Sequence, residues 1–554
     1  MTQSSLDTPV SPETKPPAGI KTKFPVWFLL AGLMLAFSVD LLFWNKKTGI
    51  SIAIWILLTL AGIFLLAWRE KVRPSLFSLV LTGGILLMAG MTALRMEGFT
   101  RFMNTFLALG GLMLLAATFT NGHWTHYRVI DYFVPILVAV FGGLGRAGQV
   151  LTLPAHENGE TEKRSALSQV MKHFIPVLRG LLIAVPILLI LGGLLAQADM
   201  VFADKLKEFF KLFDIERLPE YLFRLFYVLV LAYTFIGIYL QAVLPQKAAK
   251  RPDPQRAWMQ PFLGWTETSI VLGSIDLLFA VFVAIQFRYL FGGTTNINEF
   301  NYTYAEYARR GFGELVAVAI LSLGIYLCLA TVTRKQQTHQ QRGFSILSVL
   351  LLLLVLVMLA SSLQRMLLYE AAYGFTRLRT YTHVFIFCLA ALLLATIFLE
   401  VTNNRGRFGL ALLVFSLAFA LALGVMNVDG FIARQNIQRA LTYRTSRDLD
   451  VSYLTELSSD AVPVMVQAYN NPDLLQNTRD KLGAELSCRL TLAAQEEPVP
   501  WQSTHPANAR AIRMMNALAP QLFSKYPVKN DEYGRLSVQL GAENHACEIN
   551  RWID

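Results

Sequence analysis

Apolar residues along this chain gather into long blocks that are separated by short polar segments. Each block holds about 20 residues with almost no charge, and an α-helix needs that length to cross roughly 30 Å of hydrocarbon. Twelve blocks can be followed, at 25–44, 48–68, 75–94, 101–121, 130–153, 174–196, 221–244, 267–290, 312–333, 344–366, 381–401 and 408–427. The pattern predicts an all-α fold, a polytopic bundle of transmembrane helices.

Composition and tryptophan placement agree with a membrane protein. Of the 554 residues, 54% are hydrophobic and 16% are charged, against roughly 25% charged in an average soluble domain. Trp27, Trp44, Trp68, Trp124 and Trp265 lie at or near block ends, at the headgroup level that indole rings favour. The lipid bilayer is therefore the first predicted partner.

The two ends of the chain lack such blocks. Residues 1–24 are rich in Pro, Ser and Thr and cannot form a core, so they are predicted to be a disordered tail. The bundle is predicted to occupy 25–427, followed by a soluble, mainly helical domain at 428–554. In this domain the apolar spacing predicts helices near 431–446, 452–470, 473–495 and 505–518, and a short strand at 536–540. The segment 457–460 (LSSD) is predicted to provide a helix N-cap, with Pro463 in the first turn that follows.

Lysine and arginine in the connecting segments predict the orientation of the bundle, because cytoplasmic loops carry an excess of them. The basic segments 154–172, 245–257 and 334–342 are predicted to be cytoplasmic, and the segments that alternate with them, 197–220, 291–311 and 367–380, to be external. The 428–554 domain is then extracytoplasmic.

Counting back from these loops to the N-terminus leaves two alternatives. With twelve spans the basic N-terminal tail falls outside, against the charge rule, whereas eleven spans make the tail cytoplasmic and obey the rule at both ends. The weakest block is 130–153, which is interrupted by the glycines of 142–148. Eleven spans are favoured, with 130–153 re-entrant or interfacial, and twelve remain open.

Motifs for catalysis or cofactor binding are absent from the sequence, apart from two weak matches. Residues 143–148 read GLGRAG and match G-x-G-x-x-G, but they lie between spans, where glycines also let helices pack closely. His123 and His126 have a spacing that can bind a metal, but no third ligand is near. The net charge of +11 is assigned to loops beside anionic headgroups. We therefore predict no catalytic residue, cofactor, metal or nucleic acid.

The four cysteines divide into two pairs. Cys328 and Cys388 lie within apolar spans, where small core residues are common. Cys488 and Cys547 are the only cysteines of the 428–554 domain. An oxidising compartment permits a disulfide between them, and two free buried thiols are the alternative.

Among acidic residues inside spans, Asp276 is the deepest, about ten residues into its block. A charged group at that depth costs roughly 2.5–3.5 kcal/mol on insertion scales, so it tends to face the bundle interior and to be paired. A structural ion pair with a neighbouring helix is one interpretation, and a proton or ion relay is the other.

Polar blocks that adjoin span ends on the predicted external side form the strongest constellation. They read YAEYARRGFGEL at 304–315, YEAAYGFTRLR at 369–379, NVDGFIARQN at 427–436 and DLDVSYL at 448–454. Short tethers keep such blocks near one another, and their charges are complementary. Glu306 and Glu314 are predicted to pair with Arg377, Arg379 or Arg434, and Asp448 and Asp450 with Arg309, in one polar, tyrosine-lined site. Its candidate residues are Tyr304, Glu306, Arg309, Arg310, Glu314, Tyr373, Arg377, Arg379, Arg434, Asp448 and Asp450.

With the segment ADMVF at 198–202, these blocks resemble a family of bacterial polytopic membrane proteins classed only as a domain of unknown function, here identified by the number 4173. The resemblance covers about 170–465, and Val428 stands where the family often has proline. It implies a bacterial inner-membrane protein and supplies no catalytic residues.

Three kinds of function remain compatible with the sequence. The favoured one is a non-enzymatic envelope protein that senses or scaffolds through its external domain and loops. A transporter or lipid-handling protein that uses the buried acids is the second, and an enzyme acting at the outer leaflet through Glu306 or Asp448 and Asp450 is the third. A protein partner or small ligand is not indicated by any residue pattern.

Overall fold

The computed structural model describes residues 24–132, scattered positions between 184 and 205, and residues 218–244, 260–290, 312–443, 449–530, 534–541 and 543–547. The predicted tail at 1–24 lies outside this part of the chain except for its last residue. The predicted blocks 130–153 and 174–196, with the GLGRAG segment, also lie outside it apart from a few positions.

Within the described residues, ten helices are long and apolar enough to cross a membrane. They are α1 (Pro25–Phe43), α2 (Ser51–Arg69), α3 (Leu76–Leu94), α4 (Gly98–Thr118), α8 (Leu218–Val243), α9 (Trp265–Leu290), α11 (Phe312–Val332), α12 (Thr338–Tyr373), α13 (Arg377–Val401) and α14 (Phe408–Met426). Each coincides with a predicted block. The prediction of an all-α, multi-pass membrane protein is confirmed.

The chain divides into two compact units, which are described separately. The first holds Met1–Asp40 and Leu144–Gly237, with most of α1 and α8. Inside it, Arg224 of α8 donates two hydrogen bonds to the buried Asp40 of α1, at 2.8 and 2.5 Å. Tyr227 donates a further hydrogen bond to the same carboxylate. A charge within a span is thus neutralised by a partner on another helix, as the cost of burying it requires.

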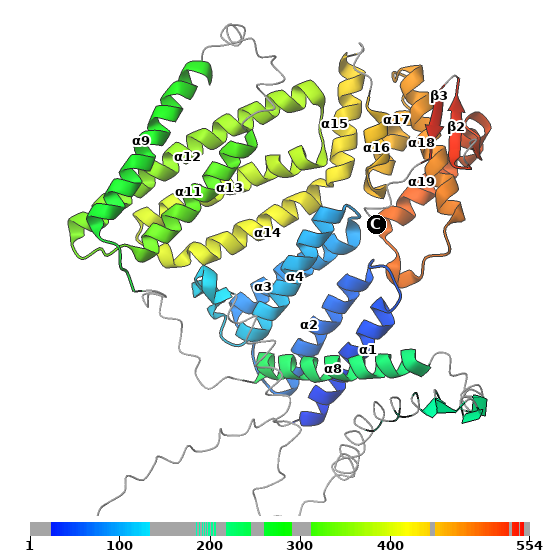
Figure 1. Cartoon of the computed structure of the whole chain (residues 1–554), viewed down its shortest axis with the longest axis horizontal. Coiled ribbons are helices and arrows are strands. Elements are labelled where there is room, and N and C mark those ends of the chain that lie inside the picture. The colour runs from blue at the N-terminus through cyan, green and yellow to red at the C-terminus, as the bar shows by residue number, and fades with distance from the viewer. Residues whose placement is uncertain are drawn as a thin grey trace, which may run out of the picture. The chain divides into compact units, whose positions relative to one another are not determined.

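The second unit holds Leu41–Gly143 and Ile238–Asp554. In its membrane part, α12 packs against α9, α11 and α13, and α14 packs against α3, α4 and α13 (Figure 1). Apolar side chains of α9, α11, α12 and α13, among them Leu272, Leu323, Val355 and Leu393, form a continuous core. Short 3-10 turns lie at His123–His126 (η1) and Arg405–Arg407 (η5).

The C-terminal region continues directly from α14. Its elements are α15 (Val428–Tyr443), α16 (Val451–Thr455), η6 (Ser459–Ala461), α17 (Val462–Tyr469), α18 (Gln476–Gln495), η7 (Trp501–Ser503), α19 (Pro506–Lys525), β1 (Val528–Asn530), β2 (Leu536–Leu540) and β3 (Glu543–Ala546). The strands form an antiparallel sheet in the order β1-β2-β3, with Val538 opposite both Val528 and His545. The predicted strand at 536–540 is confirmed as β2.

The segment 452–470 is not one continuous helix, because the chain turns between α16 and α17, and the cap predicted within 457–460 is confirmed. The Ser458 side chain accepts a hydrogen bond from the Asp460 N–H and starts a new helix there. Pro463, which has no N–H to offer, occupies the first turn of α17.

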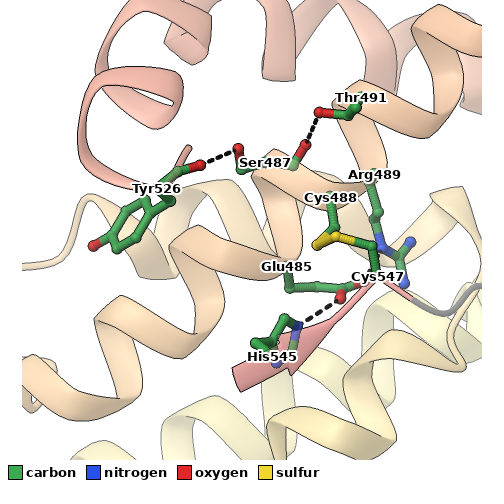
Figure 2. Close-up of a disulfide and its surroundings, with 8 residues drawn as sticks. All are labelled: Glu485, Ser487, Cys488, Arg489, Thr491, Tyr526, His545 and Cys547. Carbon is green, nitrogen blue, oxygen red and sulfur yellow. Dashed lines mark hydrogen bonds and ion pairs between the residues drawn. A yellow bond between two sulfur atoms is a disulfide. The ribbon is translucent and has the colours of Figure 1, made fainter. Parts of the chain in front are cut away.

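A disulfide joins α18 to the residue that follows β3. The Cys488 and Cys547 Cα atoms are 5.1 Å apart, and Figure 2 shows the bond above the Glu485 carboxylate. Arg489 donates to that carboxylate at 2.6 Å, and His545 of β3 lies 3.3 Å from its other oxygen. The structure therefore has the bonded form of the two alternatives. The β3 segment is also held to α18 by the His545 contact and by an ion pair between Lys481 and Glu543 at 3.2 Å.

The core of the C-terminal region extends into the membrane helices. Leu423 of α14 belongs to the same buried cluster as Ile432, Leu454 and Met465, and Phe419 and Tyr381 pack against that cluster. The C-terminal region and the ends of α13 and α14 therefore share one core.

Candidate functional site

Charged side chains meet where the C-terminal region contacts the ends of the membrane helices. The central pair is Arg377, at the start of α13, with Asp429, in the first turn of α15. The Arg377 Nε and Nη2 atoms donate to the two Asp429 carboxylate oxygens at 2.8 and 2.7 Å. Asp429 is fully buried and also accepts the Ser458 N–H at 2.7 Å. This fork-to-fork geometry is the strongest arrangement for an arginine–carboxylate pair.

A second contact comes from the turn between α3 and α4. The buried Asp460 carboxylate of η6 accepts the Met96 N–H at 2.7 Å, and Arg95 lies 3.9 Å from its other oxygen. The Arg95 Nε donates to the Gly424 carbonyl at 2.6 Å, which satisfies a free carbonyl in the last turn of α14. Arg95 thus links three segments that are far apart in sequence.

Glu97 completes this turn and reaches α13. Its carboxylate accepts the Phe99 and Thr100 N–H groups at 2.8 and 2.7 Å and so caps the start of α4. The Tyr381 hydroxyl of α13 donates to it at 2.5 Å. We call the set Arg95, Glu97, Arg377, Tyr381, Asp429 and Asp460 the junction.

The connection between α12 and α13 is clasped by α15. The Asn436 amide accepts the Phe375 N–H at 2.8 Å and donates to the Phe375 carbonyl at 2.9 Å, as a neighbouring strand would. Arg439 donates to the Ala372 carbonyl at 2.7 Å. Gly374 has φ +79°, and a Cβ there would lie 2.8 Å from Arg439 and Asn436 atoms. Glycine is therefore required at this turn.

His505, just before α19, forms a separate contact with α3, α4 and the start of α2. Its Nε2 atom lies 3.2 Å from the Arg101 guanidinium and 3.2 Å from the Thr48 carbonyl, and its Nδ1 atom lies 3.4 Å from the Ala93 carbonyl. Nearby, the Ile50 N–H donates to the Thr504 carbonyl at 3.1 Å. The ring is 5% exposed, so its polar atoms depend on these partners.

Burial shifts the pKa values of Asp460 and His505 in opposite directions. Removal from water raises the pKa of the Asp460 carboxyl, although the Met96 N–H and Arg95 oppose this. Removal from water lowers the pKa of the His505 imidazole, and the Arg101 charge lowers it further. In both cases desolvation, which disfavours the charged form, is the largest cause.

Comparison with known proteins matches residues 82–468 to the family described as Domain of unknown function (DUF4153). The match spans more than half of the chain. The protein belongs to this family. No curated protein and no solved structure matches the chain. The number 4173 given above for the resembling family is wrong, because the matching family is DUF4153.

The DUF4153 match contains every junction residue, from Arg95 to Asp460, and ends before His505 and the disulfide. The junction is therefore built from residues inside the family's range, whereas the His505 contact and the α18–β3 link lie in the part that follows it.

Of the eleven predicted site residues, five lie outside the described part of the chain: Tyr304, Glu306, Arg309, Arg310 and Asp448. The pairings predicted for Glu306, Arg309 and Asp448 therefore remain predictions. Among the described candidates, Arg377 is at the junction, paired with Asp429, which the sequence analysis had not nominated.

Two further candidates, Arg379 and Tyr373, contact Tyr369. The Arg379 guanidinium carbon is 4.0 Å from the Tyr369 ring centroid, and Arg379 donates to the Gly374 carbonyl at 2.5 Å. The exposed Tyr373 meets Tyr369 edge-to-face, with centroids 5.0 Å apart. The Tyr369 ring thus holds the Arg379 guanidinium beside the clasped α12–α13 connection by a cation–π contact.

The remaining candidates are more scattered. Glu314 is exposed in the first turn of α11, and Arg434 is exposed on α15. Asp450 is also exposed and caps α16 by accepting the Tyr453 N–H at 3.0 Å. Asp276 is buried within α9, away from this group.

Sequence reasoning missed Arg95, Glu97 and His505 and used Asp460 only as a helix cap. One signal was present: Arg95 and Glu97 lie in the short connection 95–100 between two apolar blocks, where a charged side chain has to find a partner or cap a helix. For His505 the sequence holds no comparable signal.

The junction can hold segments together but offers little to a substrate. Its buried carboxylates are already occupied by arginine, tyrosine and backbone N–H groups. Over the ranges that the structure describes, no three His, Cys, Asp or Glu side chains are grouped to hold a metal ion. The arrangement is that of a mechanical coupling between helix ends and the C-terminal region.

Proposed function

We propose that this multi-pass protein works in the inner membrane of a bacterium as a non-enzymatic envelope protein that senses or scaffolds. Its C-terminal region would lie outside the cytoplasm and be coupled to the membrane helices through the junction. The excess of lysine and arginine in the loops at 154–172, 245–257 and 334–342 supports this orientation. The Cys488–Cys547 bond is chemistry of an oxidising compartment and supports it independently.

The observation that carries the proposal is the Arg377–Asp429 pair. Asp429 has no exposed surface, while its partner belongs to a helix of the membrane bundle. Breaking one side of a buried pair leaves an uncompensated charge and costs about 3–5 kcal/mol. If the C-terminal region moves, α13 therefore has to move with it, and if α13 moves, the C-terminal region has to follow.

The external polar site remains part of this proposal. Arg379, Tyr373 and Tyr369 lie next to the clasped connection and provide exposed aromatic and cationic surface there. Tyr304, Glu306, Arg309 and Arg310 would complete the site from the 291–311 segment. A ligand or partner bound at this surface would act on the α12–α13 connection and, through Asn436 and Arg439, on α15.

A double-mutant cycle tests the coupling. Arg377→Gln, Asp429→Asn and the double variant are placed in nanodiscs, and hydrogen exchange is followed at the Ser458 amide, which donates to Asp429. Each single variant should speed exchange there strongly. The effect of the double variant on exchange should be much smaller than the sum of the two single effects, since no unpaired charge remains. Leu378→Ala, an exposed neighbour of Arg377, serves as the control and should change nothing.

The same variants distinguish a coupling protein from an enzyme. Each variant is expressed in a strain that lacks the gene. The envelope phenotype of the deletion should return in proportion to the loss of docking measured by hydrogen exchange. Unchanged exchange at Ser458 in both single variants would overturn the coupling. Full docking with lost complementation in Asp429→Asn alone would instead favour a catalytic carboxylate.

A further inference from the structure

Asp276 lies in the middle of a membrane helix. It follows Trp265, the first residue of α9, by eleven positions, or about 16 Å along the axis. That depth is close to the centre of a hydrocarbon layer roughly 30 Å thick. Asp276 is 4% exposed. Among the residues that the structure describes, neither of its carboxyl oxygens has a hydrogen-bond partner.

The helices around Asp276 can be set in register from contacts at their ends. Trp265 lies against Gly343 at the start of α12, and Val283 packs with Met358 further along, so α9 and α12 run parallel. Ser362 of α12 donates to the Phe312 carbonyl at the start of α11, so α11 runs antiparallel to both. By this register Asp276 is level with Leu352 of α12 and Ser322 of α11.

No cation on these three helices is near that level. Helix α11 contains no lysine or arginine. The arginines of α9 and α12 are Arg288, Arg342 and Arg365, each about 15 Å or more away along the axis. An ionised carboxylate in this apolar core would carry a large free-energy cost. The neutral acid avoids most of that cost.

Along α12 the nearest buried hydroxyl group lies on the Trp265 side of Asp276: Ser348 is four positions from the level of Asp276, whereas Ser361, on the other side, is nine positions from it. Ser348 of α12 is fully buried, and its Oγ has no hydrogen-bond partner among the described residues. By the same register it lies between Asp276 and Thr268, whose hydroxyl is 3.0 Å from that of Thr333. These groups lead toward the α9 end that carries Trp265. In the other direction the next polar residue of α9 is Gln286, ten positions on.

We propose that Asp276 is a proton-binding site at mid-membrane, loaded from the aqueous side that faces Trp265. The hydroxyls of Ser348 and Thr268 would be the polar groups closest to the path of the proton. In the orientation proposed above this side is the cytoplasm, but the site itself does not depend on the sensing or scaffolding role. Release of the proton would place an unpaired charge between α9, α11 and α12. Those helices would then separate or admit water, which gives the bundle two states.

Carbodiimide labelling tests the bound proton. Dicyclohexylcarbodiimide is apolar and adds to protonated carboxyl groups, so the full-length protein in nanodiscs should be labelled at Asp276, and less as pH rises. Asp276→Asn should remove the label. Glu267 and Glu314, exposed acids of α9 and α11, are internal controls and should stay unlabelled. The infrared difference between wild type and Asp276→Asn should show the carbonyl band of a neutral acid, and carboxylate bands at neutral pH would overturn the proposal.

Access is tested in proteoliposomes of known orientation. When the pH of the outer medium is changed, the extent of Asp276 labelling should change in those molecules whose Trp265 end faces the outer medium. Ser348→Ala should slow the response several-fold, whereas Ser361→Ala, at a buried serine further along α12, should not. A response from the opposite side, or an equal one from both, would overturn the assigned direction.

Discussion

The junction carboxylates each bind backbone N–H groups as well as side chains. Asp429 accepts the Ser458 N–H, Asp460 the Met96 N–H, and Glu97 two N–H groups of α4. A backbone donor fixes the position of a whole segment, which a flexible side chain cannot do. Replacing these acids by alanine would therefore leave buried N–H groups unpaired, at about 1–3 kcal/mol each.

Gly374→Ala should destabilise the protein by about 1–3 kcal/mol, because the residue has positive φ and because its Cβ would meet Arg439 and Asn436. Thermal unfolding in detergent measures the effect. Gly313→Ala is a suitable control, since a Cβ at Gly313 meets nothing within 4 Å. Equal melting temperatures for the two variants would contradict the clasp described for the α12–α13 connection.

Acidification should weaken the contact made by His505. Its folded pKa is below the ordinary 6.5, because burial and Arg101 disfavour the charged ring. The unfolded state then binds more protons, so stability is full above 6.5 and is lost as pH falls from 6.5 toward the folded pKa. Burial raises the pKa of Asp460, which gives the opposite slope, beginning near 3.8.

Hydrogen exchange at residues 501–511 between about pH 7.5 and 5.5 measures this dependence. His505→Gln, which keeps a polar side chain but does not titrate, should flatten the slope in that range. An unchanged slope would assign the dependence to another group.

Much of the site at this scale was not predictable from sequence. The Arg377–Asp429 pair joins residues 52 positions apart, and the Met96–Asp460 contact joins residues 364 apart. Nothing local specifies such partners, because any acidic residue of these polar blocks could pair with any of their arginines. The blocks were therefore recognised as polar and complementary, while the particular partner of Arg377 was not.

Among the elements, α18 and β3 are joined in a way that can be tested chemically. The Cys488–Cys547 bond closes a separation of 59 residues. Cys547→Ser should therefore lower the unfolding free energy of the C-terminal region by about 2–5 kcal/mol. Adding reductant should lower the thermal stability of the wild type by as much as the Cys547→Ser substitution does, and should have no effect on the variant.

Cys328→Ala is the control, since that cysteine is free and lies on α11. A free thiol at Cys488 in protein isolated from the envelope would contradict the bond. If the bond is absent, the Glu485–His545 contact and the Lys481–Glu543 ion pair would still link α18 to β3.

Elements in the membrane were predicted more closely than those outside it. The need to bury every backbone hydrogen bond in lipid makes length and apolarity sufficient to locate a helix. In the C-terminal region, periodicity located α15, α18 and β2, but a single serine and a proline divided the predicted 452–470 helix. Where water can satisfy the backbone, local turns compete with helix continuation.

For the molecule as a whole, orientation is the property to test first. Lys250→Cys and Arg510→Cys, each in a background that keeps the Cys488–Cys547 pair, should react with a membrane-impermeant maleimide from opposite sides. Arg510 is exposed on α19 and should be labelled once the outer membrane is opened. Lys250 should be labelled only after lysis. Labelling of both positions from one side would reject the proposed topology.

The core shared between the C-terminal region and α13 and α14 has a consequence for biosynthesis. Because Phe375, Tyr381 and Leu423 complete that core, the region cannot finish folding as it emerges from the ribosome. It has to wait until α13 and α14 are inserted and their ends have reached the same side of the bilayer. A chain inserted with the wrong topology would leave the apolar faces of α15 and α17 uncovered, and quality-control proteases could then remove it. Folding of the last 127 residues would in this way report on correct insertion of the membrane helices that precede them.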